Sequence, residues 1–201
     1  MSDTSYITVE KEADDSFVEK RSKFIGYCKP VSTQQEALDF INQIKAKHWD
    51  ARHNVYAYCL RDNQVKRYSD DGEPQGTAGM PVLEAMTKNN VTDAVVVVTR
   101  YFGGVLLGTG GLVRAYSHSA VLALQAAGIV KMEQCLVCSL SCDYNQYGKV
   151  SALIPQCGGV IDNSDFGTDV SIDFHINSVG FNTLSKQHSE TTCGQVEPQE
   201  K

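Results

Sequence analysis

The stretch AVVVVTRYFGGVLLGTGGLVRAYSHSAVLALQAAG, residues 94–128, decides the fold. Its first part, residues 94–101, is almost entirely apolar and β-branched, which predicts a strand buried on both faces. A glycine-rich turn follows, and residues 112–127 predict a long, mostly apolar helix. We expect this helix to end at Gly128, because glycine readily adopts the left-handed conformation that ends helices. A buried strand followed by an apolar helix indicates a helix packed beneath a sheet.

Shorter elements are expected on the N-terminal side of this stretch. Alternation of apolar residues predicts strands over residues 6–10, 24–28, 54–60 and 65–69, and the third should be central because both of its faces are apolar. Thr33 and Glu36 have the spacing of a capping box, which starts an expected helix that runs to about residue 47. A second helix is expected over residues 81–88.

The pattern restarts at about residue 132. We expect strands over residues 134–144, 159–164 and 168–177, helices over residues 146–157 and 179–187, and a polar closing strand over residues 192–196. The order strand, helix, strand, strand, helix, strand is the split βαβ arrangement of ferredoxin-like domains. The sequence therefore predicts an α+β protein of two domains, residues 1–131 and 132–201.

Amino-acid composition and charge limit the classes of protein to which this chain can belong. The 201 residues are 42% hydrophobic and 21% charged with a net charge of -6, so a folded core is expected rather than disorder. Residues 1–131 carry 15 basic and 15 acidic residues, whereas residues 132–201 carry 3 and 9. An acidic segment repels phosphate backbones, so we expect the C-terminal domain to dock proteins and any nucleic-acid contact to come from a local patch of the N-terminal domain.

The N-terminal sequence and the number of cysteines indicate the cellular compartment of the protein. The acidic N-terminal stretch lacks the cationic and apolar regions of an export signal, and the apolar run at residues 94–98 is too short to span a bilayer. Seven cysteines, an odd number in a chain without an export signal, favour reduced thiols. We therefore expect a cytoplasmic protein with no membrane contact.

Two similar tetrapeptides precede expected helices and are candidate phosphate sites. Glycines let successive N–H groups face one anion, the start of a helix adds positive partial charge, and a threonine can donate to a phosphate oxygen. The alternative is a pair of capped turns, for which these residue types are also common. The candidate residues are Gly76, Thr77 and Gly79 in the first loop and Gly108, Thr109, Gly110 and Gly111 in the second.

Charged and aromatic residues near these loops suggest further contacts. Asp70, Asp71 and Glu73 supply enough carboxylates for magnesium, although Asp-Gly and Glu-Pro are also turn formers. Arginine binds phosphate bidentately and aromatic rings stack on bases, so a nucleotide or single-stranded RNA platform is one interpretation. The other interpretation is that these residues have only structural roles. The residues concerned are Arg100, Tyr101, Phe102, Gly103, Gly104 and Arg114.

Other metal or nucleophile chemistry has little support. Cys135 and Cys138 have a zinc half-site spacing, but on an expected strand they face opposite sides, so they cannot share a metal. His53 and His118 have no evident Cys, Ser or Asp arrangement for nucleophilic catalysis.

Four motifs together resemble one family. KRSKFIGY (residues 20–27), SDDGEPQGTAGMPVL (69–83), VVVVTRYFGGVLLGTGGLVRAYSHSA (95–120) and CDYNQYGKVSALIPQCGGVIDNSDF (142–166) closely resemble bacterial YigZ-type members of the IMPACT family. The C-terminal ETTCGQVEPQEK is more polar than that family's closing strand. The signature residues map onto Gly72, Pro74 and the loop, carboxylate, arginine and aromatic candidates given above, with the exception of Thr109.

The resemblance implies both a fold and a cellular role. It implies an N-terminal α+β domain like one in a small-subunit ribosomal protein and in small-molecule kinases of the galactokinase type, and a ferredoxin-like C-terminal domain like one in elongation factor G. Eukaryotic members of the family regulate translation under amino-acid stress. RNA, the ribosome or a translation-related protein are therefore the partners that the resemblance suggests.

Three functions follow as hypotheses. The first is a noncatalytic, translation-associated regulator that binds an RNA or nucleotide phosphate between the two loops, with Arg100 and Arg114 as counter-charges. The second is a magnesium-dependent enzyme acting on a phosphorylated small molecule. It is disfavoured because no lysine follows the glycine loop as in a P-loop. The third is a protein-interaction module without a ligand.

Overall fold

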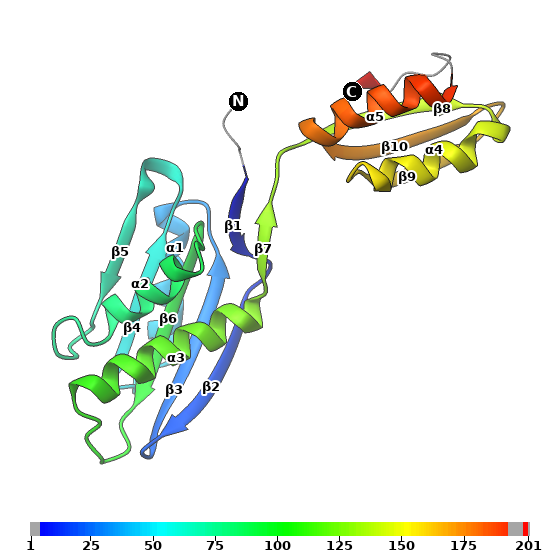
Figure 1. Ribbon diagram of the computed structural model, residues 1–201. Helices are drawn as coiled ribbons and strands as arrows, with labels where there is room; N and C mark the ends of the chain where they lie inside the picture. The colour runs from blue at the N-terminus through cyan, green and yellow to red at the C-terminus, as the bar shows by residue number, and fades with distance from the viewer. Residues whose placement is uncertain (1–4, 193–198, 201) are drawn as a thin grey trace. The chain divides into compact units, whose positions relative to one another are not determined.

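A computed structural model describes residues 5–192 and 199–200 (Figure 1). These residues divide into an N-terminal unit, Ser5–Met132, and a C-terminal unit that begins at Glu133. Helices and sheets occur in both units, which confirms the prediction of a two-domain α+β protein. The boundary lies one residue after the one predicted.

The N-terminal unit is built on a five-stranded antiparallel sheet. Its order is β2 (Ala13–Glu19), β3 (Ser22–Pro30), β6 (Ala94–Tyr101), β4 (His53–Cys59) and β5 (Lys66–Ser69). The middle strand, β6, is the strand predicted from the apolar run, and its residues 94–98 are completely buried. The hydrophobic clusters on the two faces of the sheet both include residues of the central strand β4, so this strand is covered on both faces, as predicted.

Helices cover both faces of this sheet (Figure 1). Helices α2 (Gly79–Lys88) and α3 (Thr109–Ala127) share one hydrophobic cluster with Val96 and Val98 of β6. Helix α1 (Gln34–Lys47) shares the other cluster with Val95 and Val97. This alternation along β6 explains why its sequence is apolar at every position rather than at every second one.

Caps and close contacts fix the ends and the packing of the helices. The Thr33 side chain accepts a hydrogen bond from the Glu36 N–H at the start of α1, as the capping box predicts. Helix α3 ends at Gly128, which has a φ of +74°. A Cβ at Gly26 on β3 would lie 2.5 Å from the Ser119 carbonyl oxygen, so only glycine allows α3 to pack this closely on the sheet.

Several elements complete the N-terminal unit. Strands β1 (Tyr6–Val9) and β7 (Ile129–Met132) pair antiparallel in a separate ribbon, and a short 3₁₀ helix, η1 (Asp62–Gln64), joins β4 to β5. Strands β2 and β7 fall outside the strands that the sequence predicts.

The C-terminal unit has the predicted ferredoxin-like arrangement. The chain order is β8 (Cys135–Cys142), α4 (Tyr144–Gln156), β9 (Val160–Phe166), β10 (Val170–Asn177), α5 (Ser178–Thr192) and β11 (Gln199–Glu200), with a sheet order of β11-β8-β10-β9. Both helices pack on one face, against Ile172, Phe174 and Ile176. The closing strand predicted over residues 192–196 lies largely outside the described residues, while β11 pairs with β8.

Candidate functional site

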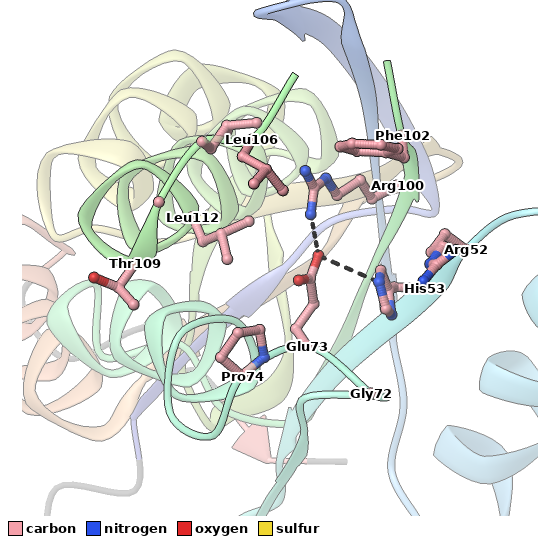
Figure 2. A pocket seen from close by; sticks show the side chains of 12 residues that line it. Arg52, His53, Gly72, Glu73, Pro74, Arg100, Phe102, Leu106, Thr109 and Leu112 are labelled. Atoms are coloured by element: carbon pink, nitrogen blue, oxygen red, sulfur yellow. Dashed lines mark hydrogen bonds and ion pairs between the residues drawn. The ribbon is translucent and has the colours of Figure 1, made fainter. Parts of the chain in front are cut away.

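A cavity of about 470 Å³ lies in the N-terminal unit beside the first turn of α3 (Figure 2). Four segments meet there: the start of β4, the turn after β5, the end of β6, and the loop that leads into α3. The wall is formed by Arg52, His53, Gly72, Glu73, Pro74, Arg100, Phe102, Leu106, Leu107, Gly108, Thr109 and Leu112.

Strand register brings the polar residues of the cavity together. His53 on β4 and Phe24 on β3 both pair with Arg100 on β6. Residues paired in this way have side chains on the same face of a sheet. The Arg100 guanidinium lies near two aromatic rings, with its carbon 5.5 Å from the centroids of both Phe24 and Phe102.

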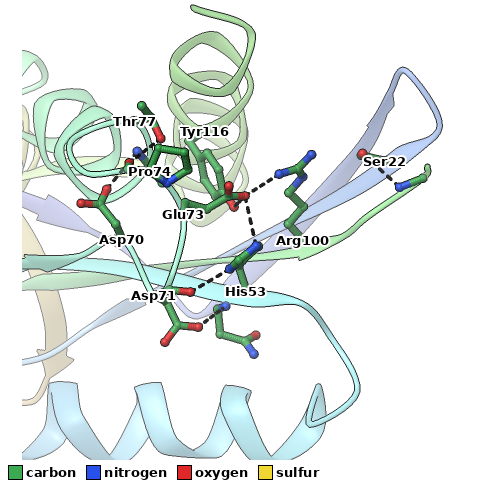
Figure 3. A network of polar contacts seen from close by, with 12 residues as sticks. Ser22, His53, Asp70, Asp71, Glu73, Pro74, Thr77, Arg100 and Tyr116 are labelled. Atoms are coloured by element: carbon green, nitrogen blue, oxygen red, sulfur yellow. Dashed lines mark hydrogen bonds and ion pairs between the residues drawn. The ribbon is translucent and has the colours of Figure 1, made fainter. Parts of the chain in front are cut away.

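Glu73 is the centre of a buried polar network (Figure 3). Its Oε1 accepts hydrogen bonds from Arg100 Nη1 at 2.5 Å and from the Tyr116 hydroxyl at 2.8 Å. Burial, followed by the Glu73 charge, raises the pKa of Tyr116, which therefore remains a donor. Because the Glu73 and Arg100 side chains are only 4% and 6% exposed, they form a salt bridge that is largely shielded from water.

The orientation of the His53 ring follows from its partners. Nδ1 lies 2.7 Å from the Asp71 carbonyl oxygen, and because a carbonyl can only accept, Nδ1 carries a proton. Nε2 is then the nitrogen that faces the cavity, 3.7 Å from Glu73 Oε1. In the neutral ring Nε2 is a hydrogen-bond acceptor.

The same cavity presents donors suited to an anion. Arg100 Nε is buried and has no hydrogen-bond partner among the described residues. Gly108, with a φ of +74°, precedes α3, and no described side chain caps this helix. The first N–H groups of a helix have no partner within it and carry positive partial charge. Gly108 and Thr109 therefore bring such donors to the cavity wall.

The first predicted phosphate loop is already occupied by a carboxylate of the chain itself. Asp70 accepts hydrogen bonds from the N–H groups of Gly76 at 2.9 Å, Ala78 at 3.1 Å and Gly79 at 2.8 Å. The Thr77 hydroxyl donates to the Pro74 carbonyl oxygen. Asp70 thus caps α2 from within the chain, and neither Gly76 nor Gly79 lines the cavity.

The three predicted magnesium ligands have separate partners. Asp71 accepts hydrogen bonds from Lys45 Nζ at 2.8 Å and from the Asn54 N–H at 2.7 Å, whereas Asp70 caps α2 and Glu73 binds Arg100. No group of three or more metal-ligating side chains is found among the residues that the structure describes. The geometry therefore offers the magnesium hypothesis no support. Cys135 is exposed and Cys138 is buried, so the two thiols face opposite sides of β8, as the strand geometry predicts.

Tyr101 lies on the other face of the sheet from Arg100. Its hydroxyl donates to Asp50 at 3.0 Å, so it accepts from His48 Nδ1 at 2.9 Å. The Tyr27 hydroxyl in turn donates to His48 Nε2 at 2.6 Å. This chain satisfies a neutral imidazole, and burial lowers the pKa of His48.

The remaining candidates have structural positions or face a second cavity. A Cβ at Gly103 would lie 2.0 Å from the Arg21 carbonyl carbon, so this glycine is required for packing. Gly104 has a φ of +81° in a turn. Gly111 and Arg114 line a separate cavity of about 260 Å³, and Gly110 lies beside the Arg114 guanidinium. The structure thus brings Arg100, Phe102, Gly108 and Thr109 together but places Arg114 elsewhere.

Sequence reasoning missed the roles of Arg52 and His53 at the cavity. His53 was noticed only as a histidine at the start of a strand. The register that places it opposite Arg100 was the missing signal, and no local motif contains it. In the sequence, Tyr116 and the leucines of the wall have the pattern of ordinary core residues.

Comparison with known proteins places both domains in a family. The Impact N-terminal domain model matches residues 20–124, and a model described as a domain of unknown function, DUF1949, matches residues 140–195. The chain belongs to the IMPACT family. The IMPACT family member YvyE of Bacillus subtilis is 36% identical over 98% of this chain and 91% of its own length. The IMPACT family member YigZ of Escherichia coli is 39% identical over 73% and 74% of the two chains.

Solved structures include a full-length match to this IMPACT family chain. A crystal structure of a hypothetical protein is 31% identical, with a TM-score of 0.62 over 100% of this chain and 98% of its own. The family relationship confirms the resemblance predicted from the four motifs.

Proposed function

We propose that the N-terminal domain binds a phosphate of RNA or of a nucleotide in the cavity beside α3, and that the protein acts as a translation-associated regulator. The observation that carries the proposal is that one cavity wall combines the buried Arg100 guanidinium, whose Nε has no partner among the described residues, with the uncapped start of a 19-residue helix. Arginine and helix N-termini are two common sources of phosphate-binding donors in proteins.

The charge balance of the wall supports an anionic ligand. Arg52 and Arg100 supply two positive charges, and Glu73 supplies the one carboxylate that lines the cavity. Glu73 is already bound to Arg100, so the exposed Arg52 and the positive end of α3 remain to attract phosphate. Phe102 is 45% exposed and Leu106 is 82% exposed, which provides apolar surface for a base beside the phosphate.

The translation role rests on the family resemblance rather than on the cavity. The C-terminal domain fits a protein-docking surface, because nine acidic and three basic residues fall within residues 132–201. Helices α4 and α5 pack together on one face of its sheet, and no helix among the described residues of this unit packs on the other face. A translation-related protein or the ribosome is the partner that we propose. No helix of the described residues combines the length and the apolar character needed to cross a bilayer.

A salt titration of RNA binding tests the proposal. We expect a short fluorescent RNA to bind the full chain with an affinity that falls as salt rises, because phosphate contacts release counterions. Arg52→Ala should reduce the slope of log affinity against log salt by about 1, since one phosphate contact is lost. Arg67→Ala, an exposed arginine on β5 outside the cavity wall, is the matched control and should leave the slope unchanged. Absence of salt-dependent RNA binding, with no thermal stabilisation of the protein by nucleotides, would refute the proposal.

A further inference from the structure

The phosphate cavity also contains two hydrogen-bond acceptors that the proposed function does not use. Glu73 Oε1 has its protein donors, but no described residue donates to Oε2 of the same carboxylate. Nε2 of His53 faces the same space, and in the neutral ring this nitrogen is a hydrogen-bond acceptor. Both side chains line the cavity (Figure 2). A ligand that fills the cavity must satisfy these acceptors as well as the donors of Arg100 and α3.

A phosphate oxygen cannot satisfy them. The Glu73 side chain is 4% exposed, and two negative oxygens in contact in such a poorly hydrated site repel strongly. The ligand group beside Glu73 must therefore be a donor, such as a hydroxyl or an amino group. The phosphate is then expected away from Glu73, at the part of the wall that Gly108 and Thr109 form at the start of α3.

The Arg100 guanidinium and the Glu73 carboxylate are close together, and this limits how far the donor of the ligand can lie from its phosphate. Arg100 Nη1 and Glu73 Oε1 are 2.5 Å apart, so the anion-binding and acceptor groups adjoin. The ligand must carry its donor directly beside its phosphate. In RNA the 2′-hydroxyl is on the carbon next to the one that bears the 3′-phosphate, whereas the amino groups of the bases lie farther away.

We propose that this cavity selects RNA over DNA, with Glu73 and His53 sharing, in a three-centre hydrogen bond, the single proton of a ribose 2′-hydroxyl while Arg100 and α3 hold the adjacent phosphate. This inference rests on the proposed phosphate binding and specifies its ligand class. The 2′-hydroxyl is the group by which proteins distinguish the two nucleic acids at a given site. Glu73 then has a positioning role toward Arg100 and a recognition role toward the ligand.

Three uridine oligomers of equal length test the inference with the full chain. Uracil has no exocyclic amino group, so a base donor cannot substitute for the hydroxyl. We expect the ribo-oligomer to bind at least about tenfold more tightly than its 2′-O-methyl and 2′-deoxy counterparts, because each lacks the donor for a charged acceptor. The 2′-O-methyl oligomer keeps the ribose pucker of RNA, which separates the hydroxyl from the shape of the chain.

Variants identify the residues responsible. Glu73→Gln keeps an oxygen for Arg100 and Tyr116 but replaces Oε2 by an N–H₂ group, so the preference for the ribo-oligomer should fall to about twofold or less. Glu84→Gln, an exposed glutamate on α2 outside the cavity wall, should retain the full preference. His53→Ala, which leaves the buried salt bridge intact, provides a second test if circular dichroism shows that Glu73→Gln does not fold.

The outcomes separate the two proposals. Equal affinity of the parent protein for all three oligomers would overturn the inference and leave phosphate binding intact. A parent preference that survives in the folded variants would also overturn it, because other residues would then recognise the hydroxyl. Failure of every oligomer to bind at low salt would overturn the inference together with the proposed binding of RNA.

Discussion

Replacing Arg100 by methionine should destabilise the N-terminal domain by about 3–5 kcal/mol. Methionine keeps much of the apolar contact with Phe24 and Phe102, so the main effect is electrostatic. The substitution leaves the Glu73 carboxylate 4% exposed without its nearest cation. Removing one partner of a buried pair costs more than the pair itself contributes, because the remaining charge has lost its water.

Amide hydrogen exchange measures this loss separately in each domain. Peptides from β3 and β6 report opening of the N-terminal domain, and peptides from β10 serve as an internal control. Since 1.4 kcal/mol corresponds to a factor of ten, exchange in β6 should accelerate by on the order of 10²–10³-fold or more, while β10 should not change.

A double-mutant cycle tests the assigned cause. Arg100→Met combined with Glu73→Gln should be at least about 2 kcal/mol more stable than the sum of the two single effects predicts, because the neutral side chain removes the stranded charge. Two results would refute the reasoning: a loss below about 1 kcal/mol for Arg100→Met, or additivity of the two substitutions. Either would mean that Glu73 is effectively solvated or that Arg100 acts through other contacts.

Three further predictions use the same exchange measurement in β6. Gly103→Ala should cost more than about 2 kcal/mol, because its Cβ would lie 2.0 Å from the Arg21 backbone; Gly104→Ala meets no atom within 4 Å and should cost only about 1 kcal/mol of backbone strain. Asp70→Ala should cost about 1–3 kcal/mol, since three N–H groups lose their acceptor, and an unchanged stability would contradict its capping role. Because burial lowers the pKa of His48 below 6.5, the unfolded chain binds more protons than the folded one as pH falls from about 6.5, so stability should decrease over that range. His48→Gln should reduce this dependence, and an unaltered pH profile would exclude His48 as its source.

The elements that sequence reasoning found are those with a strong apolar pattern. Strand β6 was predicted with its observed bounds because burial on both faces leaves no polar position before Thr99. The strands it missed lie where that pattern is absent. Residues 13–19 of β2 read ADDSFVE and are mostly exposed, since β2 lies at the edge of the sheet. Such a strand forms because β3 offers a hydrogen-bonding edge, and this is a property of the partner rather than of the segment.

The site was predictable only where its residues are neighbours in the chain. Arg100, Phe102, Gly108 and Thr109 come from one glycine-rich segment, and they do share the cavity. His53 joins them through the pairing of β4 with β6, which depends on which strands become neighbours in the sheet. Long-range pairing of this kind leaves no local signal in a single sequence.

The two Gly-Thr loops show why similar local motifs have different capacities for binding. Both precede a helix and both contain a glycine with positive φ, so the sequence predicted one role for both. The first follows Asp70 by six residues, and the turn through Asp71 and Gly72 returns the Asp70 carboxylate to the loop. The residue at the same spacing before Gly108 is Phe102, whose ring can accept no comparable hydrogen bond. The start of α2 therefore has an internal anion, whereas the exposed start of α3 has donors left open to water or to an acceptor from outside the chain, which is why we propose the ligand site at α3 and not at α2.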